Sequence, residues 1–210
     1  ISWWKRNLPI APIRQVFVND QSRHVVISYN DGEGSDAGVG IAIWCPSKIT
    51  RPWAGFITVP EEVRDLWQLQ HRHAVTQVEG NPELEFNDII EIEGVGPLLI
   101  LANWGHILRH SLWLHFIDNS SALGSLVKGS STVTQQDVIV GATWEYIAEL
   151  DVLAWFDRVD SKSNPVDGLS RQDFSKTVNC NWLWKGITFP KKLRSAIREA
   201  VEQMKVSSYR

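Results

Sequence analysis

Four acidic residues fall where predicted strands end or predicted helices begin. Asp31 follows an apolar stretch, Glu93 heads a long apolar segment, Asp118 ends the stretch "SLWLHFI", and Asp167 opens a short polar-to-apolar segment. Strand ends and helix starts on one edge of a sheet converge, and converging carboxylates repel one another unless a cation neutralises them. Oxygen-rich clusters suit hard divalent ions such as Mg²⁺ or Mn²⁺. Two such ions about 4 Å apart can activate a water and stabilise a leaving oxygen in phosphodiester cleavage, so a metal site is one interpretation of these four acids.

Each acid also has an ordinary structural interpretation. In "FIDNSSALGSLVKGSS", residues 116–131, Asp118 could cap the helix that follows, with Asn119 or Ser120 as the other plausible caps. Asp31 stands in an Asp-Gly pair, which is typical of turns, and Asp167 follows an Asn-Pro pair. These short patterns alone therefore leave capping and metal binding open.

The segments that position the acids alternate between strand-like and helix-like patterns. β-Branched and aromatic runs predict five strands, at residues 23–30, 39–45, 53–59, 111–117 and 152–159. Helical spacing or apolar length predicts helices at residues 60–75, 88–108, 119–129 and 133–149, a short one after residue 163, and a basic amphipathic one over about 190–204. This order predicts an α/β fold with a five-stranded mixed sheet, three antiparallel strands first, and helices packed on both faces.

Composition limits the possible classes of protein. The 210 residues are 43% hydrophobic, enough for one sizeable core, and we expect an arm over 1–22, a main domain over 23–175 and a basic tail over 176–210. A net charge of −3 gives no support for strong nonspecific polyanion binding. Two cysteines, Cys45 and Cys180, predict a reducing intracellular compartment, the cytoplasm or nucleus. No apolar run approaches 18 residues, so we expect no membrane span.

Several motifs resemble those of one known family. The segment 116–131 is similar to "TDNxAALxxLxKGxS", and "WFDRVDSKSNPVDGLSR" is similar to "WxxxxxSxxNxADxLSR". The first hairpin, "SYNDGEGSDAGVGIAIW", and the spacing of Glu93 to Trp104 also fit this pattern. These motifs belong to the ribonuclease H domain of retroelement reverse transcriptases, above all the tyrosine-recombinase type and its protist relatives. The resemblance covers roughly residues 1–175 and implies a ribonuclease H-like fold.

The resemblance implies a function and roles for the site. It implies a metal-dependent endonuclease that hydrolyses the RNA strand of RNA–DNA hybrids, with the reverse transcriptase portion of the same polyprotein as a partner. Asp31, Glu93, Asp118 and Asp167 occupy the family's catalytic, metal-binding positions, which hold two ions. Gly32, Asn119 and Ser120 are the candidates for contacts with the substrate backbone.

The chain also departs from the family's pattern near two of the acids. Asn30 stands before Asp31 where Thr or Ser is usual, and "GVGP" follows Glu93 in place of helix-forming residues. Glu91 competes with Glu93 for the same role. An alternative function is therefore a catalytically inactive binding or scaffold module with the same fold, in a larger assembly.

Overall fold

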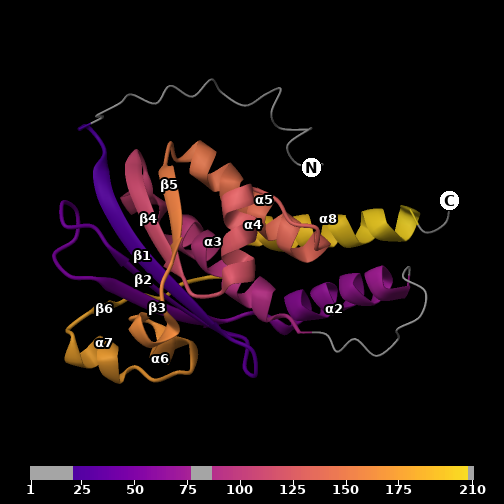
Figure 1. Ribbon diagram of the computed structural model, residues 1–210, viewed down its shortest axis with the longest axis horizontal. Coiled ribbons are helices and arrows are strands. Elements are labelled where there is room, and N and C mark those ends of the chain that lie inside the picture. Colours follow the sequence, from indigo (N-terminus) through magenta and orange to yellow (C-terminus); the bar gives the residue numbers. More distant parts are fainter. Residues whose placement is uncertain (1–20, 77–86, 208–210) are drawn as a thin grey trace.

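A six-stranded mixed sheet forms the centre of the computed structural model, which describes residues 21–76 and 87–207, without the side chains of 72–76 and 204–207. The strand order is β5-β4-β1-β2-β3-β6. The bounds are β1 His24–Glu33, β2 Gly38–Trp44, β3 Trp53–Thr58, β4 Ser111–Ile117, β5 Leu153–Arg158 and β6 Leu183–Trp184. β1, β2 and β3 form an antiparallel meander, while β4 and β5 run parallel to β1 (Figure 1). The predicted α/β class and mixed sheet are confirmed.

The predicted count of five strands is wrong, because a short sixth strand extends the sheet. β6 pairs in parallel with β3. The amide of Leu183 donates to the carbonyl of Pro52, and the amide of Lys185 donates to that of Ala54, each at 2.8 Å. Two residues are too few to leave an alternating hydrophobic pattern in the sequence.

Strand β1 also runs further than predicted. We expected a turn from Asp31 onwards, but Asp31, Gly32 and Glu33 continue the ladder with β2, and Asp31 pairs with Gly40. The turn comes later, because the Glu33 carboxylate accepts hydrogen bonds from the amides of Ser35 and Asp36 at 2.8 and 2.9 Å. Asp31 is therefore held inside the sheet rather than in a loop.

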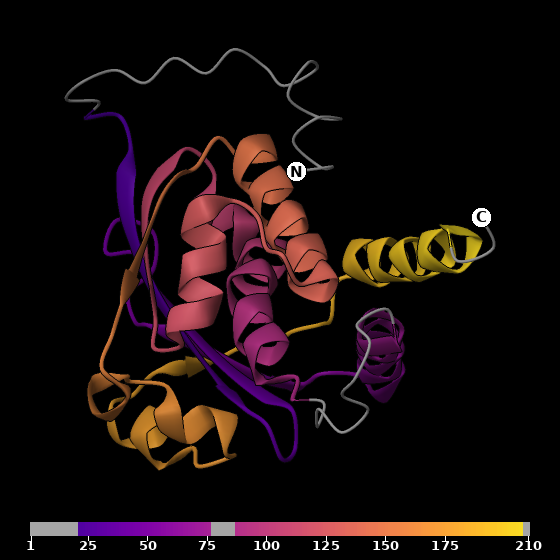
Figure 2. The same cartoon turned by 45° about the vertical axis from the view of Figure 1, so that its right-hand side comes forward.

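The helices cover the two faces of the sheet unequally. Their bounds are α2 Glu61–Thr76, α3 Ile89–Leu108, α4 Ser120–Lys128, α5 Thr134–Glu149, α6 Asp167–Ser170, α7 Ser175–Asn179 and α8 Lys191–Ser207, with a single 3₁₀ turn η2 at Ser161–Ser163. On one face, α3 packs on β1 and β2, α4 packs on β4 and β5, and α5 covers α3 (Figure 2). On the other face, the short helix α6 covers part of β1, β2 and β3. Helices on both faces were predicted.

The main core lies between the sheet and helix α3. Helix α3 is apolar nearly all round, as expected of a helix buried on most of its sides. The segment predicted as a tail takes part in this core through Leu193 and Ile197 of α8, which packs against α2 and α5. Of the arm predicted for 1–22, residues 1–20 lie outside the described residues. No helix within 21–76 or 87–207 has the length and apolar character needed to cross a membrane.

Candidate metal centre

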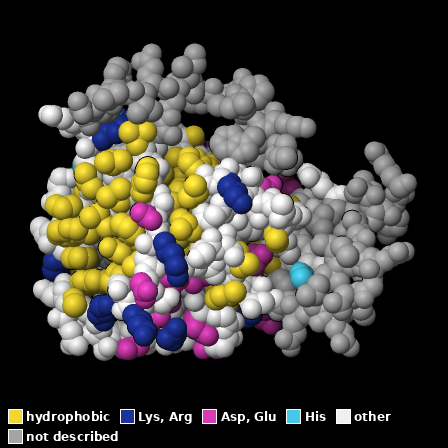
Figure 3. All heavy atoms as spheres, viewed as in Figure 1, with side chains coloured by type: hydrophobic (Ala, Val, Ile, Leu, Met, Phe, Trp, Pro, Cys, Tyr) yellow, Lys and Arg dark blue, Asp and Glu magenta, His cyan; other side chains and the backbone are white. Residues whose placement is uncertain are grey.

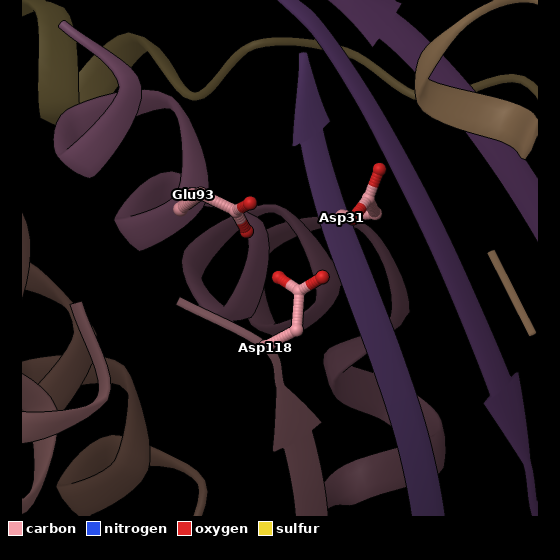
Figure 4. A group of neighbouring side chains, drawn as sticks. All are labelled: Asp31, Glu93 and Asp118. Carbon is pink, nitrogen blue, oxygen red and sulfur yellow. The ribbon is translucent and has the colours of Figure 1, made fainter. Parts of the chain in front are cut away.

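Three of the four predicted acids come together at one point. Asp31, Glu93 and Asp118 each offer a carboxylate oxygen, and these oxygens lie within 4.8 Å of one another. Figure 4 shows the three side chains around the end of β1, with Glu93 reaching in from α3 and Asp118 from just beyond β4. Asp31 and Glu93 are buried, and Asp118 is half-buried. The arrangement is an all-oxygen donor set of the type that hard divalent cations prefer.

The parallel pairing of β1 with β4 places two of these acids side by side. Tyr29 lies opposite Phe116 in the ladder, and Asp31 and Asp118 each follow two residues later. We predicted that the first and fourth strands are neighbours and bring these two acids within reach of one cation. The strand pairing and the closeness of the carboxylates are both confirmed.

The helix after Asp118 is capped by another residue. The side-chain oxygen of Asn119 accepts hydrogen bonds from the amides of Ser121 and Ala122, both at 3.0 Å. Asn119 is thus the N-cap of α4, in agreement with one of the predicted alternatives. The Asp118 carboxylate is left to face Asp31 and Glu93.

Burial and mutual repulsion raise the pKa values of two of the three acids when no metal is bound. The pKa of Glu93 is raised to about 9, first by burial and then by the charges of Asp31 and Asp118. The pKa of Asp31 is raised to about 7, mainly by burial, with smaller contributions from Asp118 and Asp167 and an opposing hydrogen bond from Ser170. A divalent cation among these oxygens would reverse both effects by favouring the ionised carboxylates.

Glu91 does not join this group, in line with the prediction that Glu93 is the helix acid of the site. Glu91 is buried elsewhere on α3, and its pKa is raised to about 7 by burial and by the charge of Asp88. The prediction that Glu93 rather than Glu91 meets Asp118 is confirmed.

Asp167 lies near the centre but outside the close group of three. It opens α6, is about one-third exposed, and forms an ion pair with Arg171 at 3.1 Å. Its charge still contributes to the raised pKa of Asp31. The same helix reaches the centre through Ser170, whose hydroxyl donates to the Asp31 carboxylate. Asp167 is therefore positioned beside the centre, with Arg171 as its present partner.

The two departures from the family pattern, Asn30 and "GVGP", are in contact in the structure, and each compensates for the other. Pro97 lies inside α3 and has no amide hydrogen, so it leaves the carbonyl of Glu93, four residues earlier, without its helical donor. The side-chain amide of Asn30 takes that place, donating to the Glu93 carbonyl at 3.0 Å and to its carboxylate at 3.2 Å. Gly96 provides the room, because a Cβ there would lie 2.6 Å from Asn30 Nδ2. Helix α3 begins at Ile89 in spite of this motif, and Asn30 fixes Glu93 from β1.

A buried chain of hydrogen bonds orients Asn30 in turn. Since the Asn30 amide nitrogen donates to Glu93, its oxygen must accept, and it lies 2.7 Å from His115 Nε2. His115 Nδ1 then accepts from the hydroxyl of Ser28 at 2.8 Å, and Ser28 accepts from the indole of Trp113 at 2.6 Å. Burial lowers the pKa of His115 to about 3, so the ring is neutral, as this chain requires. The sequence gave no sign of this connection between His115 and the centre.

The three candidates for substrate contact have different surroundings. Gly32 lies against Glu93, where a Cβ would come 3.1 Å from the Glu93 amide nitrogen. The side chain of Asn119 is occupied by capping. Ser120 lines a hollow of about 330 Å³ along α4 and the loop that follows it. That hollow is lined by Ser120, Ser121, Gly124, Ser125, Lys128, Ser130, Ser131 and Thr132.

Comparisons with known proteins identified no relative: no protein-family model, curated protein or solved structure matches the chain. The description of the site therefore rests on the geometry of Asp31, Glu93 and Asp118.

Proposed function

We propose that the protein is a metal-dependent endonuclease with a ribonuclease H-like fold, which hydrolyses the RNA strand of RNA–DNA hybrids as part of a retroelement polyprotein. The observation that carries this proposal is the meeting of three carboxylates from three separate elements, β1, α3 and the end of β4. The strand order β5-β4-β1-β2-β3-β6 and the motifs that resemble those of ribonuclease H domains also support the proposal. The reverse transcriptase portion of the same polyprotein is the proposed partner.

The donor set fits Mg²⁺ or Mn²⁺. All three ligands are carboxylates, two of them are buried, and the pKa values of Asp31 and Glu93 are raised, first by burial and then by repulsion from the neighbouring carboxylates. Asp31, Glu93 and Asp118 would hold the ions, with Asp167 available at the margin once it leaves Arg171. Two bound ions supply an activated water and stabilise the leaving oxygen in phosphodiester cleavage.

The protein's own contribution is the rigid placement of these carboxylates. Asn30 fixes Glu93 through two hydrogen bonds, Ser170 fixes Asp31, and the cap on α4 fixes the chain next to Asp118. Rigid first ligands supported by further hydrogen bonds are what precise metal chemistry needs. In the proposed enzyme, discrimination for RNA rests on contacts with the 2′-hydroxyl group, which DNA lacks.

The hollow along α4 supports a nucleic acid as the substrate. It begins two residues after Asp118, and Lys128 adds a positive charge to a lining rich in hydroxyl groups. The hydroxyls of Ser120, Ser121 and Ser130 have no hydrogen-bond partner among the described residues. Lysine and serine side chains with free donors are typical contacts for backbone phosphates. We therefore expect one strand of the hybrid to pass over α4.

The substitution Asp118→Asn tests the metal centre without disturbing the fold, because Asn119 caps α4. Wild type should cleave an RNA–DNA hybrid in Mg²⁺ and melt at a higher temperature when Mg²⁺ is added. Asp118→Asn should abolish cleavage and the Mg²⁺-dependent shift, while its metal-free melting temperature stays equal or rises because one repulsion is gone. Asp65→Asn, an exposed acid on α2, is the matched control and should behave as wild type.

Two outcomes decide between the proposed enzyme and the inactive module. If wild type shows neither a Mg²⁺-dependent melting shift nor cleavage of the hybrid, the nuclease proposal fails and the scaffold alternative replaces it. If wild type cleaves double-stranded DNA or RNA as fast as the hybrid, the metal centre stands and the proposed substrate is wrong.

A further inference from the structure

One face of the sheet carries an exposed set of apolar side chains over β1, β4 and β5. We name it the open sheet face and define it by Val25, Ile27, Leu112, Leu114, Phe116, Leu153 and Trp155. The strand register arranges most of these residues in two rows across the three strands. One row is Val25–Leu112–Leu153, and the next is Ile27–Leu114–Trp155.

Large apolar side chains on this face of the strands are exposed. Val25, Leu112 and Trp155 are 42%, 38% and 63% exposed. Their strand neighbours Val26 and Trp113 point to the opposite face and are fully buried there. Figure 3 shows hydrophobic side chains gathered over the strands on the left of the view in Figure 1. Contiguous apolar surface of this kind marks a site of interaction.

The helix on this side of the sheet stops short of these rows. The small apolar cluster around α6 comprises Ala42, Ala54, Val166 and Leu169, with Tyr29 at its edge. Helix α6 therefore covers the β1–β2–β3 half of the face. Among the described residues, no element covers the half formed by β1, β4 and β5.

We propose that the open sheet face is the docking surface for residues 1–20 of the same chain. This segment joins the sheet at the correct place: it leads through residues 21–23 into His24, the first residue of β1, and Val25 follows at once. The first apolar row, Val25–Leu112–Leu153, thus lies where the chain enters the sheet.

The composition and length of residues 1–20 fit this surface. The segment holds ten hydrophobic residues, among them Trp3 and Trp4, and one acid, Asp20. Pro9 and Pro12 disfavour a long helix, so an extended course is expected. Three strands span roughly 10 Å, at about 4.8 Å between neighbours, and an extended chain advances about 3.3 Å per residue. Three or four residues are therefore enough to cross the face, and the remainder of the segment can cover both rows.

Thiol labelling at the open sheet face tests this proposal. The probe is Leu112→Cys in a Cys180→Ser background, where the remaining Cys45 is fully buried. In the full chain, a maleimide should react slowly with the probe. Adding Trp3→Ser and Trp4→Ser should raise the labelling rate about tenfold, which corresponds to the loss of a docking equilibrium of that size. Val25→Cys serves as a second probe on the same row if Leu112→Cys does not fold.

A matched control separates local covering from general loosening. Val178→Cys lies on α7, away from the face, at a position that is 74% exposed. It should label equally fast with and without the two tryptophans. Equal rates at Leu112→Cys in both backgrounds would overturn the proposal. So would a labelling rate that falls as the protein concentration rises, because a second copy would then be covering the face.

Discussion

The fit between Gly96, Asn30 and Pro97 makes Gly96→Ala a test of how Glu93 is held. An added methyl group would lie 2.5 Å from Asn30 Cβ and 2.6 Å from its amide nitrogen, closer than packed atoms allow. Asn30 is fully buried and cannot turn into solvent. It must therefore give up its hydrogen bonds to Glu93 and His115.

The expected loss of stability follows from these contacts. Overpacking a core costs about 1–3 kcal/mol, and leaving a buried polar group without a partner costs about 1–3 kcal/mol more. The better helix propensity of alanine returns about 1 kcal/mol. We therefore expect Gly96→Ala to lower the free energy of unfolding by about 1–5 kcal/mol. For a chain of this size the melting temperature should fall by about 2–20 °C.

The assay is thermal and urea unfolding of wild type and the variants. Gly124→Ala is the control, because Gly124 is also helical and nothing lies within 4 Å of the point that an added Cβ would occupy; it should gain about 0.5–1 kcal/mol. Combining Gly96→Ala with Asn30→Ala should cost less than the sum of the two single changes, since the clash needs both side chains. A Gly96→Ala protein as stable as wild type, or strictly additive energies, would refute the reasoning.

Three further predictions concern the centre and its surroundings. Metal-free stability should fall as the pH rises from 5 to 9, because folding raises the pKa values of Asp31 to about 7 and Glu93 to about 9, so the unfolded chain releases these protons first; urea midpoints at pH 5, 7 and 9 check this, and a flat profile would contradict it. His115→Phe should leave Asn30 without its donor, lower Mg²⁺ affinity and reduce the free energy of unfolding by about 1–3 kcal/mol, whereas an unchanged Mg²⁺ titration would limit His115 to a packing role. Arg23→Gln should lower the free energy of unfolding by about 1–3 kcal/mol, because the Arg23 side chain is only 7% exposed and holds Asp151 at 2.9 Å; an unchanged urea midpoint would show that this pair contributes nothing.

The sheet and the convergence of the acids could be predicted because the information is local. The alternation in "SLWLHFI" identifies β4 and its end, and hence the position of Asp118. The turn predicted at Asp31 was wrong for a reason that is also local: Asp-Gly favours a turn, but the Glu33 carboxylate closes one a few residues later. The pairing with β2 overrides the preference of the dipeptide.

The hydrogen bonds that fix Glu93 could not be predicted, because they join residues that are distant in sequence. Asn30 and Glu93 are 63 positions apart, and nothing in either segment alone shows that they meet. A proline inside a predicted helix, four residues after the acid, was the available signal: it indicates a carbonyl in need of another donor. The positions that departed from the family pattern, Asn30 and "GVGP", are those that this contact explains.

The pairing of β1 with β4 has a consequence for how the protein is made. Ser28 and His115, which meet across that pair, are 87 positions apart in the chain. At a synthesis rate of about 5–20 residues per second, β4 is synthesised on the order of ten seconds after β1. During that time the β1–β2–β3 meander has an unpaired edge at β1, and such an edge favours association with other chains. Asp31 has no Asp118 beside it until β4 is in place, so the proposed divalent ion would bind after the sheet has closed and would stabilise the finished fold without starting it.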